Sequence, residues 1–239
     1  MVKEFAVLLI LSVCITLGAD CFTADSFDVE KLFDIKQCQK CDLSGMPLQN
    51  ADMQKADIDF SSLEKANLDG SNFSFARMDE CNLSKVSAKK TIFKAAYLHH
   101  AVLVDANLES ADFTYAILSR GDMSGANLSY ANFKGATLES TSWENTILVK
   151  SNFQKANLMN AKFKGANLTG ANFANADLTG ASLGNAVMKD AIFKGADLTI
   201  DCSKSNCSPE DAVKMHAYAS CKRLTDAGAI IDDTTKCTN

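Results

Sequence analysis

The side chains best suited to catalysis in this chain are three histidines, His99, His100 and His216. An imidazole titrates near neutral pH and can act as a general acid, a general base or a metal ligand. The sequence contains no Gly-rich phosphate loop, no HExxH motif and no GxSxG motif in which such a group would work. We therefore expect a protein that is not an enzyme and that binds no cofactor.

Cysteines are the second set of reactive side chains. Cys38-Gln39-Lys40-Cys41 has the spacing of a redox motif, but it lacks a thioredoxin-like βαβ context, which favours a structural bridge or two core thiols. Cys81 is expected to be a buried free thiol. A metal site built from His216 and the four C-terminal cysteines is an alternative, although the spacing matches no common zinc signature, so we predict no metal. The candidate disulfide cysteines lie near the chain ends: Cys38, Cys41, Cys202, Cys207, Cys221 and Cys237.

The first nineteen residues have the features of a secretory signal. Lys3 precedes an apolar run over residues 5–17, and the small pair Gly18-Ala19 follows it. A lipid anchor at Cys14 is the alternative, but Val13 is too large for the last position of a lipoprotein box. No other segment approaches the roughly twenty apolar residues of a membrane span. We predict an exported protein, periplasmic or secreted, with no membrane span in the mature chain and with disulfide bonds that suit an oxidising compartment.

A five-residue repeat must position all of these side chains. Thirty-two units follow one another without a gap over residues 41–200, and each has a large apolar centre residue, from Leu43 to Leu198, except at Ala88. The residue two before the centre is small in thirty of the thirty-two units. A period of five fits neither a helix nor a simple alternating strand. The chain must therefore bend every five residues, with the centre and small residues pointing inward.

A longer period of twenty residues is superimposed on the repeat. An aliphatic column runs at this spacing from Ile58 to Leu198. Four units therefore make one coil, and like side chains stack on like in a continuous core. The second column at this spacing consists of phenylalanines: Phe73, Phe93, Phe113, Phe133, Phe153, Phe173 and Phe193.

Stretches such as Ala126-Asn127-Leu128 and Ala176-Asp177-Leu178 resemble the pentapeptide-repeat family, whose units read A(D/N)Lxx. The resemblance covers about two thirds of the chain. It implies an all-β fold, a right-handed quadrilateral parallel β-helix of about eight coils. At a strand spacing of roughly 4.8 Å, eight coils make a rod about 38 Å long.

The repeat divides the chain into a signal (1–19), an N-terminal cap (20–40), the β-helix (41–200) and a C-terminal cap (201–239). An amphipathic helix is expected over residues 26–36. Ser208-Pro209-Glu210 reads as the start of a second helix that runs to about Asp226, with Gly228 as its stop. This C-terminal helix is expected to cover the last coil. A dimerisation role is the alternative, so the protein is predicted to be a monomer or a homodimer through that cap.

The least regular part of the repeat runs over residues 86–104. Val86 breaks the small-residue rule there, and Ala88 underfills a centre. We predict that this segment supplies a contact surface, with an ordinary solvated face as the alternative. The candidate residues are Lys89, Lys90, Tyr97, His99 and His100.

Charge limits the function further. The net charge is −5, and residues 41–200 hold 17 acids against 15 Lys and Arg. No concentrated basic face is evident, which argues against nucleic acid as a partner. The predicted function is a non-enzymatic, exported structural or interaction solenoid with an unidentified protein partner. One alternative, implied by the family resemblance, is a DNA-mimicking modulator of DNA gyrase or of another nucleic-acid-binding protein, but it needs a strongly acidic surface and a place inside the cell. A secreted effector acting on a host or neighbouring cell is the second alternative.

Overall fold

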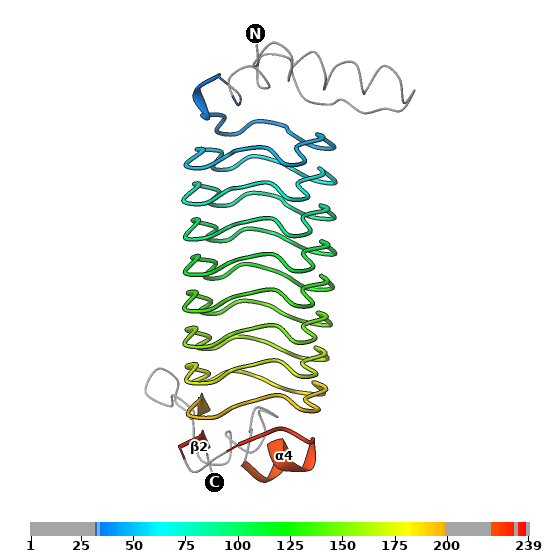
Figure 1. The fold of residues 1–239 in the computed structure, drawn as a ribbon, viewed down its shortest axis with the longest axis vertical. Coiled ribbons are helices and arrows are strands. Elements are labelled where there is room, and N and C mark those ends of the chain that lie inside the picture. Colours follow the sequence, from blue (N-terminus) through cyan, green and yellow to red (C-terminus); the bar gives the residue numbers. More distant parts are fainter. Residues whose placement is uncertain (1–31, 33, 199–220, 232–233, 238–239) are drawn as a thin grey trace, which may run out of the picture.

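The protein is a straight rod of stacked coils (Figure 1), seen in a computed structural model that describes residues 32, 34–198, 221–231 and 234–237. Successive coils are joined by parallel bridges between residues twenty apart, such as Asp42 with Ser62 and Ser62 with Asn82. This twenty-residue step continues as far as the bridge between Asp177 and Asp197. Each coil therefore contains four five-residue units, and each unit lies directly over the unit twenty residues earlier.

The unit centred on Leu63 illustrates the local geometry. Its bridging residue, Ser62, receives a hydrogen bond at its carbonyl from Leu43 N and donates its own N–H to Cys41 O, at 2.7 and 2.9 Å. The two residues after the centre form a turn, closed by Ala66 N donating to Leu63 O at 2.9 Å. Lys65, at the second turn position, has φ 60°. A positive φ recurs at this position in every unit from residue 45 to 195, as in a type II turn.

Columns of like side chains fill the interior. The seven phenylalanines of the twenty-residue column are buried, and neighbouring rings stack with centroids 4.8–5.6 Å apart: Phe73, Phe93, Phe113, Phe133, Phe153, Phe173 and Phe193. Trp143 packs edge-on against this column, 5.2 Å from the ring of Phe133 and 5.5 Å from that of Phe153. The Trp143 Nε1 donates to the buried Thr141 Oγ1 at 2.6 Å. The 4.8 Å step equals the spacing of paired strands, so the core has the same repeat as the backbone.

Polar residues at the small position are buried without losing their hydrogen bonds. Thr91 Oγ1 donates to Leu68 O at 2.7 Å, and Thr146 Oγ1 donates to Met123 O at 3.0 Å. Each bond joins one coil to the preceding coil, which satisfies a hydroxyl that would otherwise be costly to bury. Val86, larger than its position normally allows, is also accommodated and is only 1% exposed.

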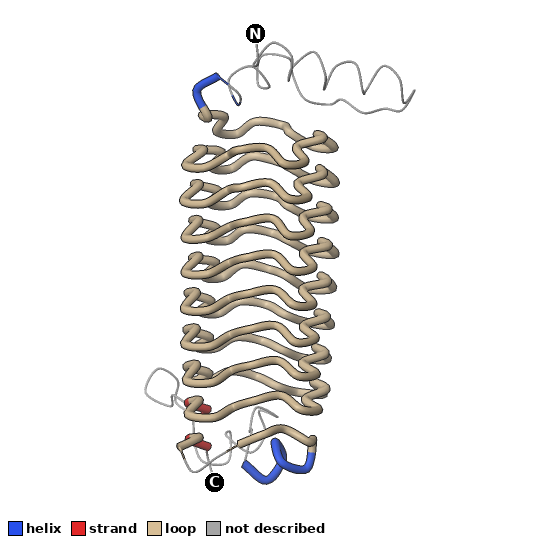
Figure 2. Tube along the Cα trace, viewed as in Figure 1, coloured by secondary structure: helices blue, strands red, loops and turns tan. Residues whose placement is uncertain are grey.

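The chain returns to the ladder after residue 198. Strand β1 (Asp197–Leu198) pairs in parallel with β2 (Lys236–Cys237), and Ile192 forms a similar bridge with Ile230. Thr235 Oγ1 donates to Phe193 O at 2.8 Å, as the hydroxyls at small positions do within the rod. Two short pieces of the C-terminal segment thus lie on the last coil as if they were further repeat units. Figure 2 shows both pieces beneath the rod.

Helix α4 (Cys221–Asp226) lies beside this returning segment at the C-terminal end of the rod (Figure 1). It ends in a Schellman motif: Gly228 N donates to Thr225 O and Ala229 N donates to Leu224 O, both at 2.9 Å. Gly228 has φ 76°, the left-handed conformation that this motif requires. Leu224 is fully buried. The expected helix start at Ser208 lies outside the described residues.

At the N-terminal end, Leu32 is buried against the first coil, and residues 34–35 are helical. Most of the helix expected over residues 26–36, and the whole signal segment, lie outside the described residues. Pro47 occupies a bridging position of the first coil, where the lack of an N–H suits a ladder edge. No helix in the described part of the chain is long and apolar enough to cross a membrane.

Candidate interaction surface

Exposed aromatic side chains gather along one corner of the rod. Phe75 and Tyr115 occupy second turn positions two coils apart and are 51% and 59% exposed. Ala95 lies between them on the intervening coil. Tyr97, two residues beyond Ala95, is 45% exposed and bridges to the half-buried Ile117. We call Phe75, Ala95, Tyr97, Tyr115 and Ile117 the aromatic corner. Exposed apolar residues that cluster in this way are typical of interaction surfaces.

The ring of Tyr115 lies against the backbone of Gly135, on the next coil. A Cβ atom at Gly135 would stand 2.5 Å from Cε1 of Tyr115, so any larger residue there would displace the ring. Gly135 also has φ 66°, which disfavours other residues. Because Gly135 has no side chain, the exposed ring of Tyr115 can pack against its backbone.

Lysines border the aromatic corner. Lys94 and Lys134 occupy first turn positions on the adjoining face, and Lys55 and Lys155 occupy the same corner before Phe75 and beyond Tyr115. All four side chains are exposed. Within the described residues none of the four has a carboxylate at ion-pair distance. The corner therefore combines aromatic rings with uncompensated positive charge.

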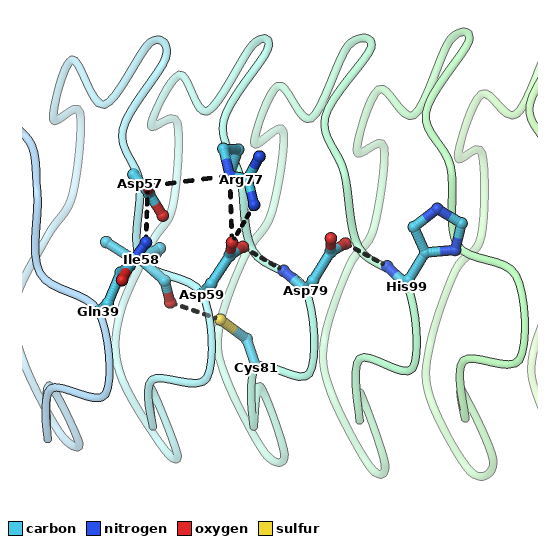
Figure 3. A network of polar contacts seen from close by, with 8 residues as sticks. All are labelled: Gln39, Asp57, Ile58, Asp59, Arg77, Asp79, Cys81 and His99. Carbon is cyan, nitrogen blue, oxygen red and sulfur yellow. Dashed lines mark hydrogen bonds and ion pairs between the residues drawn. The ribbon is translucent and has the colours of Figure 1, made fainter.

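A column of carboxylates (Figure 3) runs along the far edge of the face that holds Tyr97 and Ile117. Asp59 Oδ1 accepts a hydrogen bond from Asp79 N at 2.8 Å, and Asp79 Oδ1 accepts one from His99 N at 2.9 Å. Arg77 donates from Nη2 and Nε to Asp59 Oδ2 at 2.7 and 3.1 Å, and this contact raises the pKa of Arg77. Asp59 is only 2% exposed. These carboxylates therefore hold the backbone and Arg77 in place.

Two neighbours complete this network. Asp57 Oδ2 accepts a hydrogen bond from Gln39 Nε2 at 2.8 Å. Cys81 is a buried free thiol, as predicted, and its Sγ donates to Ile58 O at 3.0 Å. Burial raises the pKa of Cys81 to about 12. The thiol is therefore protonated at neutral pH and is not a nucleophile.

The structure divides the contact patch predicted from the sequence. Lys89 and Lys90 follow the centre Ala88, whereas Tyr97, His99 and His100 belong to the unit two further on. Because a coil takes twenty residues, ten residues are half a coil, and the two groups lie on opposite sides of the rod. The prediction of one joint surface was therefore wrong. Tyr97 remains part of the aromatic corner, and His99 follows the carboxylate column.

A disulfide joins Cys38 and Cys41, whose Cα atoms are 5.5 Å apart, at the start of the first coil. Both side chains are buried. Cys202, Cys207 and His216, and the side chains of Cys221 and Cys237, lie outside the described residues. In the part of the chain that the structure describes, no group of three or more His, Cys, Asp or Glu residues could hold a metal ion.

Comparison with known proteins agrees with this architecture. The family model "Pentapeptide repeats" matches in eight copies over residues 48–84, 91–129, 126–165 and 166–199. The chain belongs to the pentapeptide-repeat family. A search of curated proteins finds no match.

Comparison with solved structures finds several matches, of which one is similar in fold over most of the chain. A trypsin-treated variant of QnrB1, a plasmid-mediated fluoroquinolone resistance protein, superposes with a TM-score of 0.65 at 16% identity, covering 82% of this chain and 91% of QnrB1. HetL of the cyanobacterium Nostoc sp. strain PCC 7120 is 25% identical over 68% of this chain and 74% of its own, with a TM-score of 0.44. A thylakoid-lumen protein of Arabidopsis thaliana is 30% identical over 53% of this chain and 80% of its own, with a TM-score of 0.39.

Proposed function

We propose that this pentapeptide-repeat protein is a non-enzymatic, exported rod that acts by binding another protein through one of its faces. The observation that carries the proposal is the aromatic corner. Its tyrosines and phenylalanine are about half exposed, whereas the seven rings of the phenylalanine column are buried in the core. Tyrosine is among the residues that contribute most to binding at protein interfaces.

The state of the reactive groups supports a binding role. The backbone of His99 is held by Asp79, Asp59 is engaged by Arg77, and the thiol of Cys81 is buried and protonated. Each of these three contacts connects neighbouring coils. The arrangement stabilises a rigid surface and offers no paired general acid and base.

Export is supported by the signal-like first nineteen residues and by the disulfide between Cys38 and Cys41. Disulfides persist in oxidising compartments such as the periplasm or the extracellular space. The same features are compatible with secretion toward a host or neighbouring cell. The likeness to QnrB1 is one of fold, and the free lysines beside Tyr115 do not favour a DNA-mimicking surface.

Site-specific crosslinking in the native cells tests the binding role. A photoreactive residue replaces Tyr115 in the full chain, and a matched variant carries it at Tyr130, which is 54% exposed at another corner. We expect a discrete crosslinked species with Tyr115 and not with Tyr130. Equal or absent crosslinking at both positions would contradict the proposal. The intact mass of the recovered protein reports export separately, through loss of about nineteen residues.

A further inference from the structure

We propose that the aromatic corner binds an extended acidic segment in the polyproline II conformation. The inference rests on the proposed function, because it specifies which kind of partner segment the rod would bind. Three features of the aromatic corner support it: the spacing of its rings, the packing of Tyr115 on Gly135, and the charge around the rings.

The spacing of the rings matches the repeat of a polyproline II helix. The core rings step by 4.8 Å per coil, so Phe75 and Tyr115, two coils apart, are separated by about 9.6 Å along the rod. Residues i and i+3 of a polyproline II helix lie on one face about 9.3 Å apart. Same-face residues of a strand recur at about 6.6 and 13 Å, and residues i and i+7 of an α-helix at about 10.5 Å. The polyproline II repeat is the nearest of the three.

The surface between the two rings is low and preformed. Ala95 lies between Phe75 and Tyr115 and has only a methyl side chain, so the surface between the two rings is lower than the rings. The ring of Tyr115 is supported by Gly135, which limits the side-chain entropy lost on binding. Proline-rich segments dock on aromatic-lined surfaces of this kind, and their own conformation is also largely formed beforehand.

The positive charge around the aromatic corner favours an acidic partner. Asp112 is the one acid in residues 72–77, 92–97, 112–117 and 132–137, and it accepts hydrogen bonds from Thr114 and Asn132. Lys94 and Lys134 remain uncompensated within the described residues. Basic residues interleaved with rings also occur in single-strand-binding proteins, but the carboxylate column on the same face and the net charge of −5 disfavour a nucleic acid, which carries a phosphate charge at every nucleotide.

Fluorescence anisotropy with the full mature protein tests this proposal. The probe is a labelled peptide of repeating Glu-Pro-Pro, which has prolines at two of every three positions and therefore a proline at both i and i+3. Three comparison probes are repeating Lys-Pro-Pro, repeating Glu-Ala-Ala and oligothymidylate. We expect the Glu-Pro-Pro peptide to bind at least tenfold more tightly than each of the others, with an affinity that falls as salt rises. Equal binding of the peptides, tighter binding of oligothymidylate, or no binding would overturn the proposal.

Matched variants locate the site. Tyr115→Ser removes one ring, and Tyr130→Ser removes a comparable ring from another corner. Serine already occupies this turn position at Ser110 and Ser140, with φ 60° and 59°, so both variants should fold. We expect at least a tenfold loss of peptide affinity for Tyr115→Ser and no change for Tyr130→Ser. Equal losses, or none, would show that the peptide does not bind at the aromatic corner.

A second pair of variants tests the charge. Lys134→Glu should weaken binding of the Glu-Pro-Pro peptide several-fold and reduce its salt dependence, whereas Lys164→Glu, at the same turn position on the opposite face, should not. The crosslinking experiment separates the two proposals. A protein crosslinked at position 115 without binding of the peptide would overturn only the proposal that the partner segment is a polyproline II helix. Peptide binding without any crosslinked protein would contradict the cellular role.

Discussion

Asn145 lies directly over Gly165, the residue that occupies the same corner one coil further along the rod. A Cβ atom at Gly165 would stand 2.5 Å from Asn145 Oδ1. The same pairing occurs wherever Asn or Asp occupies the second turn position and the next coil is described: Asn50 with Gly70, Asp105 with Gly125, Asn145 with Gly165, Asn160 with Gly180, and Asn175 with Gly195. The corner residue of one coil therefore constrains that of the next.

Replacing Gly165 by alanine should destabilise the rod by about 1–3 kcal/mol, because alanine is strained at φ 70° and also overlaps Asn145. Chemical denaturation measures the change in the free energy of unfolding. The double variant with Asn145→Ser removes the overlap but leaves the strain at φ. A coupling of at least about 0.5 kcal/mol is expected between the two positions. Strictly additive effects would show that the overlap is relieved by an easy movement of Asn145.

The phenylalanine column should be sensitive to loss of a single ring. Phe133→Ala removes a fully buried ring that stacks on Phe113 and Phe153 at 4.8 Å. We expect a loss of about 3–5 kcal/mol in the free energy of unfolding. Phe60→Ser, at a half-exposed corner, is the control and should change it by no more than about 0.5 kcal/mol. Similar effects of both changes would mean that the column tolerates a cavity.

Cys81 should make stability fall at high pH. Its pKa is raised from 9.0 to about 12, so the folded state holds the thiol proton more tightly than the unfolded chain does. The contribution of Cys81 is complete below pH 9 and is lost as the pH rises toward 12, at up to about 1.4 kcal/mol per pH unit. Cys81→Ser can keep the bond to Ile58 O, as Ser61 bonds to Cys38 O. The difference between wild type and Cys81→Ser should therefore shrink from pH 9 to 12; a constant difference would contradict the assigned pKa.

The disulfide between Cys38 and Cys41 should stabilise the rod by an amount at the low end of the range for disulfides. It closes a loop with a sequence separation of 3, and so short a loop removes little entropy from the unfolded chain. We expect the double variant Cys38→Ser/Cys41→Ser to lose about 2 kcal/mol, measured by denaturation at neutral pH. A much larger loss would indicate that the two serine hydroxyls are costly to bury in the first coil, and Cys38→Ala/Cys41→Ala would then restore part of the stability.

The repeat was readable from the sequence because each inward position admits few residue types. The spacing from Phe73 to Phe93 gave the coil length directly, and the bridges confirm it. The same spacing already separates Lys89 from His99 by half a coil, so the error in the joint contact patch came from treating neighbours in sequence as neighbours in space. The pairing of Asn145 with Gly165 was missed because it joins residues twenty apart, whereas each was interpreted separately as a corner residue.

The return of the C-terminal segment to the ladder was also missed. Ala229 and Ile231 have the small and apolar spacing of a repeat unit, and Thr235 and Cys237 repeat that spacing six residues later. Because the step is six residues and not five, and follows a long interruption, counting in fives from Leu43 ends at residue 200. Backbone pairing of Ile192 with Ile230 tolerates the change, since a ladder requires register only at the bridging residues.

Trp143 is the single tryptophan of the chain, and its indole is fully shielded from water and hydrogen-bonded inside the ring columns. Its fluorescence should therefore emit at short wavelength and resist quenching by iodide or acrylamide in the native protein. Because Trp143 lies well away from both ends of the rod, its emission reports opening of the interior and is insensitive to fraying. Comparing the fluorescence of Trp143 with circular dichroism would show whether the coils unfold one after another from the termini or all together.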